Sequence, residues 1–300
     1  MERRILGKTG LEVSRLGLGL AQIGAFPLDD ADRVGALIHA ALDNGINFLD
    51  TAASYRNSEE LIGRAVSHRR GEYVLATKCG HWAAEAPWTA GTVREHIDRS
   101  LQRLRTDCVD LVQIHSCGVD VLERGEVIGA LLEARDAGKT RFVGYSGDNE
   151  AAGWAVDSGL FDTLQTSFNV VDQRARTRLF PYARKANVGV IVKRTIANAT
   201  WGGSTATAGT TVQFSKMYER VEKMMSLGPI PGAPDHRILT ALGFTLARSE
   251  IDVALVGTTN PEHLVDNIRL VENEMPIAEE VVAEFCRRFD EVGGDWAQLI

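Results

Sequence analysis

Three ionisable residues stand at the ends of three successive predicted strands: Asp50, Lys78 and His115. Tyr55 follows in the loop after the first of these strands. Each residue alone is weak support, because a charged side chain at a strand end is commonly part of a structural ion pair. Together, the ammonium favours the ionised phenol, the carboxylate keeps the ammonium charged, and the imidazole can orient an oxygen. The grouping therefore predicts proton donation from Tyr55 to a substrate oxygen.

A strand pattern followed by a helix pattern recurs along the chain. This repeat would place the four residues at or just after the ends of neighbouring strands. In the clearest instance an apolar helix face precedes Gly45, which suits a left-handed helix end, and a strand over 46–50 follows. That helix face is formed by Val34, Leu37, Ile38, Ala41 and Leu42. Ser58 is expected to cap the next helix. The predicted strands cover residues 15–20, 46–50, 73–78, 109–115, 141–146, 163–167, 188–193 and 253–257.

Eight strands alternating with helices in 300 residues favour an α/β fold of the closed (β/α)8 type, the TIM barrel, as a single domain over 1–300. An N-terminal β-hairpin and a long loop after the seventh strand complete the prediction. That loop, from 195 to about 235, should contain one short helix near Val221. An open doubly wound sheet is the alternative, although only part of a dinucleotide-binding glycine pattern occurs, at residues 16–20.

The overall composition excludes several classes of partner. The net charge of −7 argues against nucleic acid, and no apolar stretch is long enough to cross a membrane, so a cytoplasmic protein without a membrane partner is expected. The four cysteines lack zinc-site spacing, so we expect free thiols and no metal, with the redox role of Cys79 or Cys117 left open.

Several linked motifs resemble the aldo-keto reductase family over nearly the whole chain. They are the opening at residues 6–14, the strand at 48–52 and the helix start at 58–63. The resemblance implies the same barrel, a nicotinamide dinucleotide across its mouth, and reduction of an aldehyde or ketone by hydride transfer. Carried over position by position, the catalytic residues are Asp50, Tyr55, Lys78 and His115.

The same resemblance assigns cofactor contacts at the ends of the later strands. Ser146 and Gln165 match residues that hydrogen-bond the nicotinamide carboxamide, but the family's Ser-Asn pair is replaced, and whether Asp148 compensates is left open. Lys193 stands where an aromatic residue often stacks on the nicotinamide. Either Lys193 or Arg194 could meet the pyrophosphate instead, or the pair could simply face solvent.

The last predicted strand and the following helix start match the family's adenosine-phosphate segment. His263 stands where many members place an arginine against the 2′-phosphate, and imidazole is a poorer partner for a dianion than guanidinium. NADP(H) is the expected cofactor from the family habit, with NAD(H) or dual use as the alternative. The remaining expected cofactor contacts are Gly19, Gly257, Thr258, Thr259, Asp266 and Asn267.

The sequence constrains the substrate and the direction of the reaction less than it constrains the fold. His81, Trp82 and Trp201 could wall a partly apolar pocket, although indole rings also pack as core residues. A short tail after residue 292 suggests an open site for small aldehydes, ketones or sugar-like carbonyls. The alternatives are a sugar or aldose dehydrogenase running the reverse reaction and a cofactor-sensing regulatory subunit. A homo-oligomer is also possible from the sequence.

Overall fold

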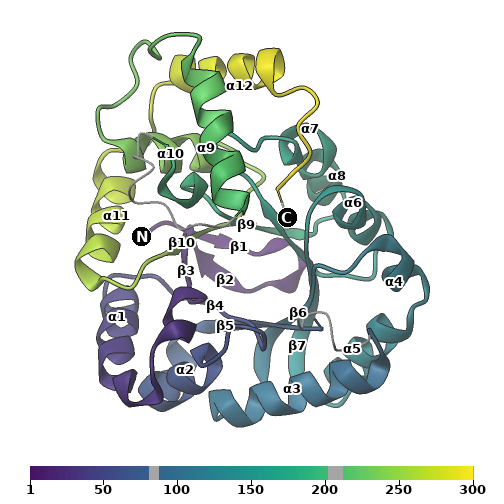
Figure 1. The fold of residues 1–300 in the computed structure, drawn as a ribbon. Helices are drawn as coiled ribbons and strands as arrows, with labels where there is room; N and C mark the ends of the chain where they lie inside the picture. The colour runs from purple at the N-terminus through teal and green to yellow at the C-terminus, as the bar shows by residue number, and fades with distance from the viewer. Residues whose placement is uncertain (81–87, 202–211, 300) are drawn as a thin grey trace.

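Eight parallel strands close into a barrel in the computed structural model, which describes residues 1–300 except 81–87, 202–211 and 300 (Figure 1). The strand order around the barrel is β10-β3-β4-β5-β6-β7-β8-β9, with every neighbouring pair parallel. The closed sheet confirms the (β/α)8 prediction and excludes the open sheet. The barrel strands are β3 Leu16–Gly19, β4 Phe48–Asp50, β5 Val74–Cys79, β6 Val109–His115, β7 Thr140–Ser146, β8 Thr163–Ser167, β9 Gly189–Lys193 and β10 Val253–Gly257.

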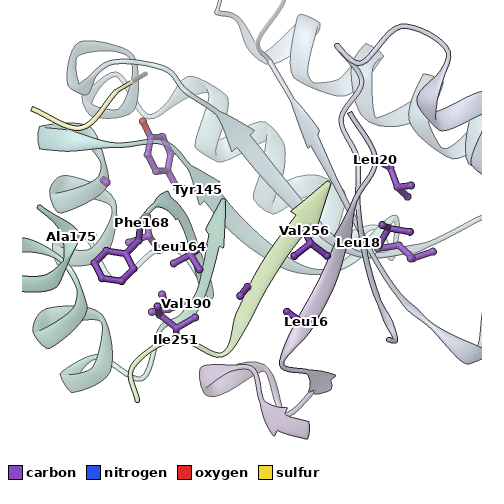
Figure 2. Packing of buried hydrophobic residues seen from close by; sticks show 14 of the residues in the cluster. Leu16, Leu18, Leu20, Tyr145, Leu164, Phe168, Ala175, Val190, Ile251 and Val256 are labelled. Atoms are coloured by element: carbon purple, nitrogen blue, oxygen red, sulfur yellow. The ribbon is translucent and has the colours of Figure 1, made fainter. Parts of the chain in front are cut away.

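Helices surround the strands (Figure 1). Buried apolar residues of both the helices and the strands form the larger core. Val34 and Leu37 on α1 are buried as predicted, and Gly45 adopts a positive φ of 86°. Figure 2 shows Leu18 on β3 and Val256 on β10 within this layer. The helices are α1 Ala31–Asp43, α2 Ser58–Val66, α3 Ala90–Leu104, α4 Val119–Glu123, α5 Glu126–Asp136, α6 Asn149–Asp157, α7 Ala175–Arg178, α8 Phe180–Lys185, α9 Val212–Met225, α10 Arg237–Leu246, α11 Pro261–Asn273 and α12 Glu279–Val292.

An antiparallel hairpin of β1 (Arg3–Ile5) and β2 (Glu12–Ser14) covers one end of the barrel, as expected (Figure 1). Its Leu6 and Val13 belong to a separate apolar cluster with residues from the strand starts, among them Phe48 and Val74. The hairpin therefore fills the end of the barrel where the strands begin. The opposite end, where the strands finish, is left for polar side chains.

Two local predictions were wrong. Ser58 is the first residue of α2 and does not cap it; its hydroxyl donates to the Leu20 carbonyl at 2.8 Å and hydrogen-bonds the Thr51 hydroxyl at 2.8 Å. The helix near Val221 is α9, which has 14 residues and is not short. Ser58 thus ties α2 to the mouth of the barrel, a tertiary role that the local capping pattern does not reveal.

Within the described residues, none of the helices combines the length and apolar character needed to cross a membrane. The interpretation of residues 1–300 as one domain stays a prediction.

Candidate active site

A buried ion pair joins the ends of two neighbouring strands. Lys78 on β5 donates from Nζ to Asp50 Oδ2 at 2.6 Å and to the Thr51 carbonyl at 2.9 Å. Burial alone would lower the pKa of Lys78, but the Asp50 carboxylate and Tyr55 outweigh that effect and raise the pKa above its ordinary value. Lys78 is therefore held as an ammonium.

Tyr55 and His115 lie beside this pair. Lys78 Nζ is 5.1 Å from the centroid of the Tyr55 ring, and the Tyr55 and His115 rings meet edge to face with centroids 5.7 Å apart. Ser54 Oγ lies 3.4 Å from His115 Nδ1. Asp50, Tyr55 and His115 all line one cavity of about 670 Å³. The structure thus brings together the four residues expected to be catalytic.

The loop that carries Tyr55 is fixed by its backbone. The Tyr55 N–H donates to the Ala52 carbonyl at 3.0 Å, and the Asn57 N–H donates to the Gly24 carbonyl at 3.3 Å. A Cβ at Gly24 would lie 2.1 Å from the Tyr55 carbonyl oxygen, so only glycine permits this approach. These contacts fix the start of the Tyr55 side chain relative to Lys78.

Ser146 and Gln165 extend the network along the cavity. Ser146 Oγ donates to Gln165 Oε1 at 2.9 Å, and Gln165 Nε2 donates to Asp50 Oδ1 at 2.7 Å. Gln165 also lines the cavity. A hydroxyl and an amide placed side by side fit the donor and acceptor groups of a nicotinamide carboxamide.

A second ion pair, between a half-buried lysine and a buried aspartate, lies at the same mouth. Lys193 Nζ is 3.0 Å from Asp148 Oδ2, and Asp148 also accepts from the Thr166 hydroxyl at 2.9 Å and the Ser167 N–H at 2.7 Å. Although burial opposes ionisation, Lys193 and the Ser167 N–H lower the pKa of Asp148. Burial together with the neighbouring Arg194 lowers the pKa of Lys193 despite Asp148. Asp148 is thus engaged by protein donors.

Arg194 follows β9 with a positive φ of 59° and lines the cavity. Its Nη1 donates to Ser167 Oγ at 3.1 Å and to the Leu299 carbonyl. Asn169 Nδ2 donates to the Arg194 carbonyl at 3.0 Å, which helps to hold this sparsely populated backbone conformation. Lys193 and Arg194 therefore both face the cavity as held cations.

The expected phosphate segment borders the cavity at its other side. Gly257 on β10 pairs with Gly19 on β3, and both line the cavity. Asn260 caps α11 by accepting from the Glu262 N–H at 2.9 Å. His263 in the first turn is exposed. One N–H of the first turn is thus already satisfied by the Asn260 side chain, and the His263 side chain faces solvent.

The remaining predicted residues of this segment differ in exposure. Thr258 Oγ1 accepts from the Asn260 N–H at 3.1 Å, and Thr259 is half-buried. Asp266 is exposed and lies 3.8 Å from Arg269, whereas Asn267 is half-buried. The structure leaves the contribution of these four residues as a prediction.

Of the three residues expected to line the substrate pocket, only Trp201 lies among the described residues. His81 and Trp82 lie outside the described residues. Trp201 packs edge to face on Phe285 of α12, with centroids 4.9 Å apart, and is not among the described residues that line the cavity. Its ring thus contacts the core, the alternative that the sequence had left open.

The thiols near the site are unpaired, and burial raises the pKa of both Cys79 and Cys117 to about 12. They are therefore held as thiols, which are poor nucleophiles.

Over the described part of the chain, no group of three or more His, Cys, Asp and Glu side chains is placed to hold a metal.

The sequence profile of the Aldo/keto reductase family matches residues 15–286. The chain belongs to this family. It is 30% identical to an L-galactose dehydrogenase of Arabidopsis thaliana, covering 90% of this chain and 88% of the relative. It is 27% identical to an NADH-specific methylglyoxal reductase of Escherichia coli K12, covering 89% and 93%.

Among solved structures, an aldo-keto reductase of Bacillus halodurans in its holo form superposes with a TM-score of 0.80. Identity is 24%, and 96% of each chain is covered, so this likeness supports the fold alone. The family and its relatives make the chain an oxidoreductase enzyme of a family that uses nicotinamide cofactors.

One contact beside the site escaped the sequence. Gln298 lies in the irregular segment after α12 and reaches the Asp148 network, with Nε2 3.3 Å from Asp148 Oδ1. A single glutamine in an irregular segment carries no periodicity or motif, so only the folded chain reveals this contact.

Proposed function

We propose that this enzyme is an NAD(P)H-dependent reductase of aldehyde or ketone carbonyls, with Tyr55 as the proton donor. The observation that carries the proposal is the Lys78 ammonium, held by Asp50 at 2.6 Å beside Tyr55 and His115 in one cavity. A purely structural ion pair has no need of a phenol and an imidazole at the same cavity wall.

Each residue has a distinct role in the proposed reaction. Ser146 and Gln165 would hold a reduced nicotinamide, which would supply the hydride for the new C–H bond at the carbonyl carbon. Tyr55 gives its proton to the carbonyl oxygen, which becomes a hydroxyl, and the phenolate left behind is stabilised by the Lys78 ammonium. Asp50 keeps Lys78 charged. His115 orients the carbonyl by a hydrogen bond to its oxygen.

The cofactor is proposed to lie along the cavity from Gln165 to the start of α11. Ser146 and Gln165 would hold the carboxamide, and Lys193 or Arg194 would meet the pyrophosphate, since both are cations at the cavity wall. Gly19 and Gly257 leave room for close approach, and Thr258 and Thr259 would donate to phosphate. Asp266 and Asn267 would contact the adenine.

NADP(H) is the first choice of cofactor, with NAD(H) as the alternative because His263 replaces the expected arginine. The relative named as an NADH-specific methylglyoxal reductase supports keeping NAD(H) open. The substrate is proposed to be a small aldehyde or a sugar-like carbonyl compound.

A second candidate is the reverse reaction, oxidation of a sugar by NAD(P)+. The relative named as an L-galactose dehydrogenase supports it, with coverage of 90% of this chain. The same residues serve both directions, because Tyr55 would then accept the hydroxyl proton as a phenolate.

The test is fluorescence titration of the purified protein with NADPH and NADH, followed by turnover on aldehydes, ketones and sugars in both directions. Tyr55→Phe should keep the dissociation constant of the cofactor and lose about a hundredfold or more in turnover. Tyr182→Phe is the matched control, because Tyr182 is 57% exposed on the surface. Unchanged turnover in Tyr55→Phe would refute the proton-donor role, and binding without any turnover would favour a regulatory subunit.

A further inference from the structure

The segment after α12 returns to the mouth of the barrel and inserts Gln298 there. Gln298 is 4% exposed. Its Nε2 donates to the Ser167 carbonyl at 2.8 Å and to Thr166 Oγ1 at 3.0 Å, and lies 3.3 Å from Asp148 Oδ1. The amide nitrogen is thus surrounded by three oxygens at the end of β8.

The other end of the same side chain is also fixed. Gln298 Oε1 accepts from the Asn149 N–H at 2.9 Å, and the Asn149 side chain returns two hydrogen bonds with the Gln298 backbone at 2.9 and 3.1 Å. Gln298 is therefore clamped to both Asn149 and the end of β8. The register of the segment cannot shift without breaking this set.

The clamp reaches the cavity through Asp148. Asp148 holds the Lys193 ammonium at 3.0 Å, and Lys193 lines the cavity together with Tyr55 and His115. The Asp148 side chain is fully buried, and the Gln298 amide is one of the groups packed against its carboxylate. Loss of that amide would hydrate the carboxylate and weaken its hold on Lys193.

The next residue of the segment acts on the second cation. The Leu299 carbonyl accepts from Arg194, and the Leu299 N–H donates to Asp172 Oδ2 at 3.0 Å. Lys193 and Arg194 are thus both held, directly or through Asp148, by two consecutive residues that lie more than a hundred positions away in the chain.

We infer that Gln298 is a positioning residue: through Asp148 it holds the Lys193 ammonium in the orientation in which Lys193 binds the dinucleotide. The inference rests on the proposed function for the identity of the ligand. The contact of Gln298 with Asp148 is independent of the proposed function. The positioning role and the proposed function can therefore fail separately.

The first experiment is a double-mutant cycle with NADPH affinity, read by fluorescence, as the measurement. Gln298→Met keeps the volume of the side chain and removes its hydrogen bonds. We expect NADPH to bind about tenfold more weakly to Gln298→Met than to the wild type, the effect of losing a hydrogen bond to a charged group. In a Lys193→Met background the same change should alter the affinity by less than about twofold.

Two controls separate this effect from a loss of folding. Asp295→Ala changes an exposed residue of the same segment and should leave NADPH affinity unchanged. Gln298→Asn retains an amide on a shorter side chain and should recover part of the affinity. An equal loss from Gln298→Met in both backgrounds, or no loss in either, would overturn the inference.

The second experiment needs no cofactor. Acetylation of Lys193 by acetic anhydride, followed by mass spectrometry, reports how firmly the ammonium is held. Gln298→Met should change the labelling rate of Lys193 by about threefold or more and leave Lys216, an exposed lysine, at the wild-type rate. If this change occurs but the wild type binds neither NADPH nor NADH, the positioning role stands and the proposed function fails. An unchanged Lys193 rate overturns the positioning role.

Discussion

The mouth of the barrel holds two aspartate–lysine pairs whose lysines have pKa values shifted in opposite directions. Lys78 contacts Asp50 at 2.6 Å, and its pKa is raised; Lys193 lies 3.0 Å from Asp148, and its pKa is lowered. Burial acts against the charge of both lysines. The neighbours of the two pairs differ: Asp50 and Tyr55 raise the pKa of Lys78, whereas Arg194 and Lys78 act with burial to lower that of Lys193.

The comparison shows that an ion pair alone does not fix the state of a buried lysine. In the Asp50–Lys78 pair, the carboxylate holds an ammonium in place, and that ammonium is suited to stabilising a phenolate. The Asp148–Lys193 pair has a weaker hold on its proton and depends on surrounding donors, including Gln298. Under the proposed function, the first pair would serve the chemical step and the second would serve cofactor binding.

The largest expected effect comes from exchanging the two carboxylates for amides. Asp50→Asn removes the charge that holds Lys78 and should lower turnover about a hundredfold or more. Asp148→Asn should lower turnover less than about fivefold and weaken cofactor binding instead, as tested by steady-state kinetics and fluorescence titration. Equal losses of turnover in both variants would erase the functional distinction between the pairs.

The same comparison predicts different costs in stability when the lysines are replaced. Lys78→Met leaves Asp50 buried without its cation and should reduce the free energy of unfolding by about 3–5 kcal/mol. Lys193→Met should cost less, about 1–2 kcal/mol, because Asp148 keeps the donors from Thr166 and Ser167. Urea unfolding followed by circular dichroism measures both. The reverse order would contradict this account.

Asp172, which accepts from the Leu299 N–H, should make the stability of the segment after α12 depend on pH. Burial raises the pKa of Asp172 to about 7, above the value of about 3.9 in an unfolded chain. Its stabilising contribution is therefore fully present below about pH 4 and is lost as the pH rises through about 7, a change of about 2–4 kcal/mol. We expect the protection of the Leu299 amide against hydrogen exchange, corrected for the intrinsic rate, to fall over this range.

Asp172→Asn is the matched variant for that measurement, because its amide does not titrate. Its protection factor at Leu299 should be nearly constant over the same pH range. A fall of equal size in Asp172→Asn would assign the pH dependence to another group.

The smallest expected effect lies outside both pairs. His263→Arg at the open start of α11 should strengthen NADPH binding by about three- to tenfold through a charge-assisted contact with the 2′-phosphate. NADH binding should not change, because NADH lacks that phosphate. Parallel titrations measure both constants, and an equal gain for both cofactors would place His263 elsewhere along the dinucleotide.

Much of the fold could be predicted because its determinants are local. The helix face with Val34 and Leu37 and the strand that ends at Asp50 follow from the period of apolar residues. The two failures, at Ser58 and α9, have other causes. The Ser58 hydroxyl donates to the carbonyl of Leu20, which is distant in sequence, and so is not available as a helix cap. Around residue 221, the Gly-, Thr- and Ala-rich composition of the segment led us to expect a shorter helix than the 14 residues of α9.

The sequence by itself determined the parallel barrel and the convergence of Asp50, Tyr55, Lys78 and His115, since strand ends in register must meet at one rim. The Asp50–Lys78 pair was expected from the sequence, but only the tertiary structure showed that Asp148 pairs with Lys193. The contacts of Gln298 and Leu299 with the Asp148 and Arg194 sites join parts of the chain that share no local pattern. The physical reason is that the pKa of a buried group depends on distances of a few ångströms between such parts, which no periodicity in the sequence encodes.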